Sequence, residues 1–328
     1  MRRIMLLVLV AAGLAPGTWV RTDPPLQDLS PRLEWQRVAV ERDCCRAGPL
    51  RLEQAWQLTS SNVEFGGYSA LLRIGPGRLT AFSDRGYFME FGEPGGARIA
   101  PRFGSTQPDS SALKTNRDIE AATWDPATGQ LWLAQEGRNV VARYGPGMQL
   151  EVRRRVPEWQ DWASNSGVEA FVRLSDGRFI ALCECRDGWF GEFRHPATIH
   201  SGDPTDARPA EAFTFAGVDG YRPTDMAQLP DGRVLILMRR LVWPVPARFA
   251  IKVALADPAE IRPGQVWRAT KIAQLSAPWP VDNYEGLAIE RQLDGTLVAW
   301  IISDENSAVS QRVLLLKVRI DEAALPPT

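Results

Sequence analysis

The stretch Glu169-Ala170-Phe171-Val172-Arg173, then Asp176-Gly177, and then Phe179-Ile180-Ala181-Leu182 reads as strand, tight turn and strand. Asp-Gly tolerates the positive φ angles that close a two-residue hairpin. The same order occurs five times, and the first strands begin at Ser69, Glu120, Glu169, Asp225 and Glu285. Successive starts lie roughly 50 to 60 residues apart, which is the length of a four-stranded blade with its loops. The chain is therefore predicted to be an all-β β-propeller of four-stranded antiparallel blades.

Further strand-like runs fill the outer half of each repeat. Examples are Val140–Tyr144 and Leu150–Arg153 in the second repeat, and Phe249–Val253 and Val266–Ala269 in the fourth. Short runs that contain Val, Ile, Phe, Tyr or Trp favour strands. We expect them to be the third and fourth strands of their own blades.

The last repeat supplies Val313–Ile320 as a third strand and no fourth, so we expect Arg51–Leu58 to complete this blade and close the ring. Five repeats predict five blades, and a degenerate sixth that includes Leu33–Val40 is left open. The expected layout is a leader at 1–20, an N-terminal segment with the closing strand at 21–64, the propeller at 65–320 and a tail at 321–328.

The charge composition excludes one class of partner. The chain of 328 residues has 38 Lys and Arg against 39 Asp and Glu, a formal net charge of −1. A nucleic-acid backbone is held by an excess of positive charge, so nucleic-acid binding is not expected. The 27 glycines and 25 prolines favour short strands joined by turns over long helices.

The N-terminal segment has the order of an export signal. Met1-Arg2-Arg3 precedes an apolar run, Ile4–Leu14, and small residues follow at Ala15-Pro16-Gly17. We therefore expect a periplasmic or secreted protein. Because Trp19-Val20 prolongs the apolar stretch, the alternative is an uncleaved anchor in the inner membrane, with the propeller facing the periplasm. Membrane contact is expected only through this segment, since no later one is apolar enough to cross a bilayer.

The four cysteines occur as Cys44-Cys45 and Cys183-Glu184-Cys185. In an oxidising compartment an even number permits disulfides, and pairing between the two clusters is among the possibilities that spacing leaves open. A zinc site is disfavoured, because neither cluster has a second ligand set and the only histidines, His195 and His200, lie together elsewhere.

Propeller geometry is expected to bring acidic side chains to one end of the central channel. The first strand of each blade lines the channel and the second returns to the same rim, so the two ends of each hairpin meet there. The hairpins start at the residues given above and end at Asp84, Glu136, Glu184, Arg239 and Asp304. Two carboxylates about 5 Å apart repel by roughly 3 kcal/mol at an effective dielectric constant near 20. Such a rim needs compensating charge.

A bound cation is one form of compensation. Oxygen ligands drawn from several blades suit Ca²⁺ or a similar divalent ion better than zinc. We predict a divalent cation, Ca²⁺ first, with four ligands: Glu120, Glu169, Asp225 and Glu285. Two alternatives stay open: the acids accept backbone N–H bonds from the neighbouring blade, or the rim binds substrate without a metal.

The other polar residues of the rim are candidates for catalysis. The predicted general base is one of three acids, Asp84, Glu136 and Glu184. The anionic part of a substrate is predicted to contact three arginines, Arg85, Arg222 and Arg239, for which internal salt bridges are the alternative. No histidine lies in a rim motif, which disfavours a Ser-His-Asp hydrolase.

The ordered set of rim motifs resembles one family. The motifs are Gly66-Gly67-Tyr68-Ser69, Ser83-Asp84-Arg85-Gly86, Asp118-Ile119-Glu120-Ala121, Asn165-Ser166-Gly167-Val168-Glu169-Ala170, Arg222-Pro223-Thr224-Asp225, Asp282-Asn283-Tyr284-Glu285-Gly286-Leu287 and Ser303-Asp304-Glu305-Asn306. Together they look like the "esterase-like activity of phytase" family, or phytase-like β-propellers. The resemblance covers about residues 65 to 320 and implies an exported propeller that hydrolyses an ester or phosphoester. Cys183 and Cys185 beside Glu184, and Ser69 in place of an acid, depart from a uniform acidic rim.

The expected function is therefore hydrolysis of an ester or phosphoester by an exported monomer, assisted by a divalent cation at the channel mouth. A non-catalytic envelope module that binds a sugar phosphate, a lipid headgroup or a protein partner is the alternative from another class. A lactonase is a further alternative. The expected partner is a small-molecule ester, phosphoester or lactone.

Overall fold

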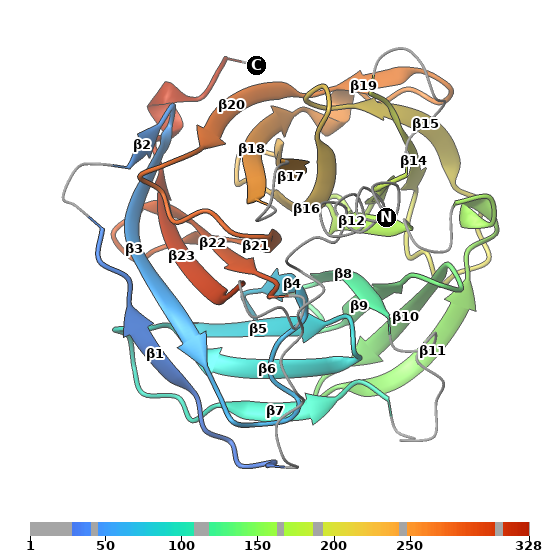
Figure 1. Cartoon of the computed structure of the whole chain (residues 1–328). Helices are drawn as coiled ribbons and strands as arrows, with labels where there is room; N and C mark the ends of the chain where they lie inside the picture. Colours follow the sequence, from blue (N-terminus) through green and yellow to red (C-terminus); the bar gives the residue numbers. More distant parts are fainter. Residues whose placement is uncertain are drawn as a thin grey trace, which may run out of the picture.

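Five small sheets stand around a common axis in the computed structural model (Figure 1). The structure describes residues 28–40, 45–107, 118–162, 167–185, 193–242, 248–305 and 311–327. The first strand of each sheet lies nearest the axis, and these five strands contact one another in a ring. The predicted all-β propeller is confirmed, with five blades.

The blades follow one another along the chain. Blade 1 contains β4 (Tyr68–Leu72), β5 (Arg78–Ser83), β6 (Tyr87–Gly92) and β7 (Arg102–Ser105). Blade 2 contains β8 (Ile119–Trp124), β9 (Leu131–Gln135), β10 (Val140–Gly145) and β11 (Gln149–Arg155). Blade 3 contains β12 (Val168–Arg173), β13 (Phe179–Cys183), β14 (His195–His200), β15 (Glu211–Ala216) and β19 (Val266–Arg268). Blade 4 contains β16 (Arg222–Gln228), β17 (Val234–Val242), β18 (Arg248–Ala256) and β20 (Thr270–Leu275). Blade 5 contains β21 (Tyr284–Arg291), β22 (Leu297–Ser303), β23 (Val313–Ile320), β3 (Leu50–Thr59) and β1 (Glu34–Arg37), and β2 (Arg46–Ala47) pairs with β3.

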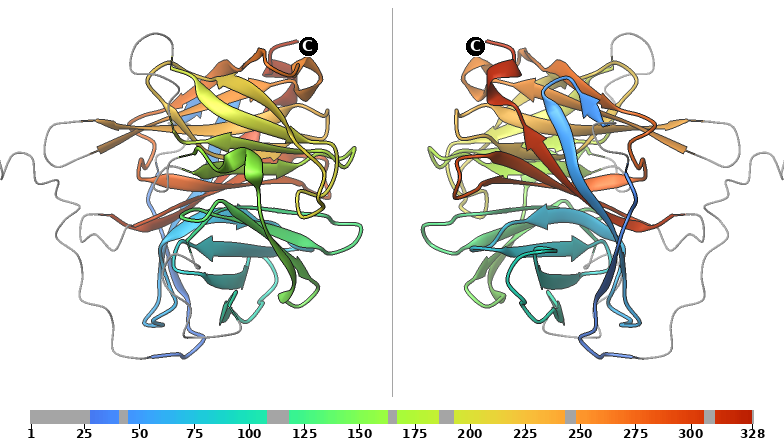
Figure 2. Two further views of the ribbon diagram at one scale, coloured as in Figure 1. Left: turned by 90° about the vertical axis from the view of Figure 1, so that its right-hand side faces the viewer. Right: turned by 90° about the vertical axis from the view of Figure 1, so that its left-hand side faces the viewer.

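The ring is closed by an N-terminal strand, as predicted. β3 pairs antiparallel with β23 from Leu50 opposite Ile320 to Leu58 opposite Val313, and Figure 2 shows the two strands side by side. The run Leu33–Val40 does not form a sixth blade, because β1 within it pairs with β3 on the outside of blade 5. Joining the two ends of the chain in one sheet removes the free edge that an open ring would expose.

The prediction is wrong for one outer strand. The run Val266–Ala269 was expected in blade 4, but its β19 pairs parallel with β15 of blade 3. The fourth strand of blade 4 is β20, which pairs with β18. Trp267 explains the choice, since it is buried against Phe213 and Phe215 of blade 3.

Apolar side chains pack between neighbouring blades. Successive residues of a strand point to opposite faces of its sheet. Ile236 of β17 accordingly packs with Ile180 and Phe215 of blade 3, whereas Leu237 packs with Ile301 and Leu316 of blade 5. Each blade is thus held on both faces, and this packing sets the position of its inner hairpin at the channel mouth.

The predicted leader, residues 1–20, lies outside the described residues. In the part of the chain that the structure describes, we find no helix with the length and apolar character needed to cross a bilayer.

His200 gives the fold a defined pH dependence. Burial lowers the pKa of this ring from 6.5 to about 4, so the folded state binds its proton only at lower pH than the unfolded state. As the pH falls from about 6.5 to about 4, the unfolded state takes up the proton first, and this group should remove about 3 kcal/mol from the free energy of unfolding. Urea unfolding at several pH values measures how the free energy of unfolding changes with pH.

The matched variant is His200→Phe, which keeps a ring against Trp159, whose centroid lies 5.9 Å from that of His200. In this variant the free energy of unfolding should no longer show the decrease of about 3 kcal/mol between pH 6.5 and pH 4. An identical pH profile in both proteins would contradict the prediction.

Candidate functional site

Each inner strand has a β-bulge near one end of the channel. In blade 1 Tyr68 pairs with Ser83 and Ala70 pairs with Phe82, so Ser69 between them has no partner. The register shifts at the corresponding place in all five blades, and the residues passed over are Ser69, Glu120, Glu169, Thr224 and Glu285. A bulge redirects the side chain of the extra residue. Three of the five are glutamates, and they belong to three different blades.

The prediction that Asp225 lies at the same position as these glutamates is wrong, because the bulge of blade 4 is at the preceding residue, Thr224. Asp225 pairs with Leu237 after the bulge at Thr224, and a shift of one residue turns a side chain to the other face of the sheet. Asp225 Oδ2 accepts the Leu287 N–H of blade 5 at 2.6 Å, and Oδ1 accepts the Met226 N–H at 2.8 Å. Burial raises the pKa of Asp225, while these two donors act against the rise. Asp225 therefore joins blades 4 and 5 and is not a rim ligand.

The substitution Asp225→Asn should lower the free energy of unfolding by about 1–3 kcal/mol. The amide has one acceptor oxygen where the carboxylate has two, so one buried N–H loses its partner. Urea unfolding followed by tryptophan fluorescence measures the loss. Asp161→Asn, at an exposed position, is the control and should change the value by less than about 0.5 kcal/mol. Equal effects of the two substitutions would rule out the inter-blade role.

The residue that ends each inner hairpin lies beside the bulge, as predicted. Four of these residues donate their backbone N–H to the residue two positions before the bulge: Asp84 to Gly67 at 2.9 Å, Glu136 to Asp118 at 2.8 Å, Glu184 to Gly167 at 3.0 Å and Asp304 to Asn283 at 2.8 Å. In blade 4, Arg239 pairs with Arg222 at the same place. The two ends of every hairpin therefore share one rim.

Blade 4 supplies positive charge to this rim. Arg239 Nη1 donates to Asn283 Oδ1 at 2.6 Å and also to Glu285, and Nη2 donates to Glu184 at 3.2 Å. Arg222 lies 3.4 Å from the other oxygen of Glu184. We name Arg222, Arg239, Glu184 and Glu285 the arginine sector. Burial acts to lower the pKa of Arg239, but Glu184 and Glu169 raise it on balance, so the guanidinium stays charged.

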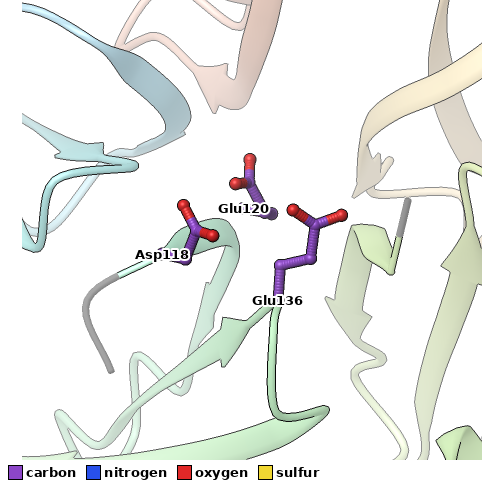
Figure 3. A group of neighbouring side chains, drawn as sticks. All are labelled: Asp118, Glu120 and Glu136. Atoms are coloured by element: carbon purple, nitrogen blue, oxygen red, sulfur yellow. The ribbon is translucent and has the colours of Figure 1, made fainter. Parts of the chain in front are cut away.

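Blade 2 supplies three carboxylates that converge. Asp118, Glu120 and Glu136 each place an oxygen within 4.8 Å of the other two, and Figure 3 shows the three groups directed into a common space. We name these residues the acidic sector. Among the described residues neither Glu120 nor Glu136 forms an ion pair, and Glu136 Oε1 accepts the Gly167 N–H of blade 3 at 2.7 Å. Burial, with Asp118 and Glu184 nearby, raises the pKa of Glu136 to about 7. Burial and then Glu169 and Glu136 raise that of Glu120.

Glu169 lies between the two sectors. Its side chain is on the third bulge and the residue is only 6% exposed, with no hydrogen-bond donor among the described residues. Burial and then Glu184 raise its pKa, whereas Arg239 and Arg222 lower it. The four predicted metal ligands are thus divided. Glu120 and Glu169 lie at the rim with no hydrogen-bond donor in the described part of the chain, Glu285 is paired with Arg239, and Asp225 points elsewhere.

In blade 1 the side chain of Arg85 binds the loop that precedes β4. Arg85 donates to Gly66 O at 2.9 Å, to Val63 O at 3.4 Å and to Phe65 O, which favours a structural role for the guanidinium. Gly67 has a φ of +69°, and a Cβ there would lie 2.4 Å from Asp84 Oδ1, so the loop requires glycine at this position. Asp84 is near enough to Glu120 to raise its pKa.

Asp118 and Glu305 are rim residues whose roles the sequence does not predict. Asp118 begins the quoted motif Asp118-Ile119-Glu120, and the alternation of side chains along a strand could have grouped it with Glu120. Glu305 accepts the Gly67 N–H at 3.0 Å and so joins blade 5 to blade 1. The question of disulfide pairing is also answered for one cluster, because Cys183 is bonded to Cys185.

Solved structures with a similar fold were found. Glutaminyl cyclase of Myxococcus xanthus has a TM-score of 0.46 at 13% identity, over 83% of this chain and 97% of that one. Hydrazine synthase of Kuenenia stuttgartiensis has a TM-score of 0.38 at 13% identity, over 78% and 62%. A Bacteroides thetaiotaomicron protein of unknown function has a TM-score of 0.45 at 12% identity, over 81% and 64%. At these scores the likeness says nothing about the activity of this chain.

The search of curated proteins found no match. The family comparison did: the model described as "Phytase-like: Esterase-like activity of phytase" matches residues 63–307, about three quarters of the chain. This span contains both sectors of the rim and confirms the resemblance seen in the rim motifs. The chain belongs to the esterase-like activity of phytase family.

Proposed function

We propose that the protein hydrolyses an ester or phosphoester at the channel mouth, beside the acidic sector. The description of the family supports this class of reaction in general terms. The observation that carries the proposal is the approach of three carboxylate oxygens of Asp118, Glu120 and Glu136 to within 4.8 Å of one another. Mutual repulsion makes this arrangement costly unless a positive charge or protons compensate it.

The donor set fits a divalent cation. Ca²⁺ binds carboxylate and carbonyl oxygens at 2.3–2.6 Å, so two ligands on opposite sides of one ion lie about 4.8 Å apart. The oxygens of Asp118, Glu120 and Glu136 meet this limit. When bound, such an ion would polarise the ester or phosphoryl oxygen and lower the pKa of an attacking water.

The remaining residues have distinct proposed roles. Asp84 ends the neighbouring inner hairpin and lies close to Glu120, so we propose it as the group that accepts a proton from the attacking water. Arg222 has 45% of its side chain exposed and is proposed to orient the anionic part of the substrate. Arg239 is held by Glu184 and Glu285, and its proposed role is to position those two carboxylates. Both carboxylate oxygens of Glu184 contact arginines, so we propose Asp84 in its place as the proton acceptor.

The proposal is tested with p-nitrophenyl acetate, p-nitrophenyl phosphate, phytate and simple lactones. Each is assayed with chelator-treated protein and again after addition of Ca²⁺, Mg²⁺ or Mn²⁺. We expect turnover of an ester or phosphoester that chelation removes and one of the metals restores. Asp84→Asn should lower kcat by about 100-fold or more without loss of metal binding. Binding of these compounds without turnover would replace the enzyme with the envelope binding module, and hydrolysis confined to lactones would favour a lactonase.

A further inference from the structure

A disulfide lies at the channel mouth on either side of Glu184. Cys183 ends β13 and is fully buried, Cys185 is partly exposed, and their Cα atoms are 5.1 Å apart. Between them Glu184 contacts Arg239 at 3.2 Å and Arg222 at 3.4 Å. The bond therefore spans an acid that joins blade 3 to Arg222 and Arg239 of blade 4.

The corresponding turn in blade 1 has the same shape without a covalent bond. There Ser83 Oγ accepts the Arg85 N–H at 3.1 Å, and in blade 3 Cys183 Sγ accepts the Cys185 N–H at 3.2 Å. Blade 5 has a serine at this position too, but the Ser303 hydroxyl donates to Arg312 O at 2.6 Å and accepts the Leu314 N–H at 2.8 Å. In blade 1 a hydroxyl is thus sufficient to form the turn, and in blade 3 the disulfide adds a second constraint.

The added constraint acts locally. A disulfide stabilises a protein mainly by restricting the unfolded chain, and the effect grows with the length of the loop that it closes. Cys183 and Cys185 are two positions apart, so the loop is very short and the gain in global stability should be small. What the bond does restrict is the backbone on both sides of Glu184.

We propose that the Cys183–Cys185 disulfide is a redox-controlled positioning element that holds the Glu184 carboxylate against Arg222 and Arg239. Its effect on substrate rests on the function proposed above, whereas its effect on Glu184 does not. In the oxidised protein the two arginines have a fixed partner. After reduction Glu184 is released, and Arg222 in particular loses the contact that holds it at the rim.

The redox step needs an external dithiol. Its thiolate attacks Sγ of Cys185, the more exposed sulfur, and the S–S bond breaks as Cys183 leaves as a thiolate that takes up a proton. The second thiol of the reductant then displaces Cys185. The protein gains two electrons and two protons, and the reductant becomes a disulfide. Dithiothreitol serves as the probe.

The first arm of the test is amide hydrogen exchange of the whole protein, oxidised and reduced. The Glu184 N–H donates to Gly167 O at 3.0 Å and the Cys185 N–H to Cys183 Sγ, so both report on the turn. We expect exchange of these amides to become at least about tenfold faster after reduction. The midpoint of thermal unfolding should move by about 3 °C or less. Unchanged exchange in protein whose thiols are shown by mass spectrometry to be free would overturn the proposal.

The second arm concerns substrate. Reduction should raise the KM for anionic p-nitrophenyl phosphate by about three- to tenfold and leave the KM for neutral p-nitrophenyl acetate unchanged. An equal change for both substrates would contradict positioning through the arginines. If neither compound is turned over, the proposed function fails, while the exchange arm still decides the role of the disulfide.

Variants separate this bond from the other cysteines. Cys183→Ser/Cys185→Ser reproduces the serine of blades 1 and 5 and should behave as reduced protein in both arms, with no further response to dithiothreitol. Cys44→Ser/Cys45→Ser keeps the bond at the mouth and should respond as the unaltered protein does. If dithiothreitol no longer had an effect on this second variant, the effect would come from Cys44 and Cys45, and the proposal would be overturned.

Discussion

Replacing Arg239 with methionine is expected to lower the free energy of unfolding by about 3–5 kcal/mol, because it removes one partner from a buried charge cluster. Arg239 is the shared donor for Glu184, Glu285 and Asn283, and its side chain is 19% exposed. Methionine preserves the apolar part of the side chain, so the loss reports on the unpaired acids. Urea unfolding at pH 7, followed by tryptophan fluorescence, measures it.

Arg222→Met is the matched control. Arg222 contacts the same Glu184, but 45% of its side chain is exposed, and exposed ion pairs contribute about 1 kcal/mol or less. The difference between Arg239→Met and the unaltered protein should also shrink as the pH is lowered, because the acids left behind can take up protons. Equal losses for the two arginines, or a loss that does not depend on pH, would show that Arg239 does not compensate the rim.

The second large effect is expected for Glu120→Gln. This substitution should raise the stability of the protein without metal and lower it, relative to the unaltered protein, in the presence of Ca²⁺. Without added metal the variant should be more stable by about 1 kcal/mol, since it removes one of three carboxylates that lie close together and Glu120 accepts no hydrogen bond from the described residues. With saturating Ca²⁺ the order should reverse, because only the unaltered protein gains stability by binding the ion. Turnover of the substrate found in the screen should fall by about 100-fold or more.

Thermal unfolding with and without Ca²⁺ measures the first two effects, and Glu285→Gln provides the control from the same bulge position in blade 5. That substitution leaves the acidic sector intact and should preserve the stabilisation by Ca²⁺. A Glu120→Gln variant that is less stable than the unaltered protein without metal would contradict the proposed repulsion.

The propeller and its closure were predictable because their signals are local. A strand, a tight turn that ends in glycine and a second strand recur roughly every 50 to 60 residues, and Asp-Gly forms the turn in three of the five repeats. Val313–Ile320 lacks a following strand, while Arg51–Leu58 precedes the first repeat. The partner of Val266–Arg268 was not predictable in this way, because a short strand-like run does not specify which blade it joins. Packing of Trp267 against Phe213 and Phe215 decides it.

The sequence predicts that polar side chains gather at one rim, but it does not predict which of them contact one another. Asp225 occupies the place of the glutamates when the repeats are aligned by residue type, but the bulge of blade 4 falls one residue earlier, at Thr224. The division of the rim also depends on contacts between blades, such as Arg239 with Glu285, which no spacing along the chain specifies. Asp118 joins the cluster only because the start of β8 and the residue after β9 meet.

The central claim is that Asp118, Glu120 and Glu136 form a cation site while the acids paired with Arg239 do not. Calorimetric titration of chelator-treated protein with Ca²⁺ tests it most directly. We predict one site in the unaltered protein, a loss of affinity of about 100-fold or more in Glu120→Gln and Glu136→Gln, and a change within about threefold in Glu285→Gln. Absence of binding in the unaltered protein, or an equal loss in Glu285→Gln, would contradict the claim.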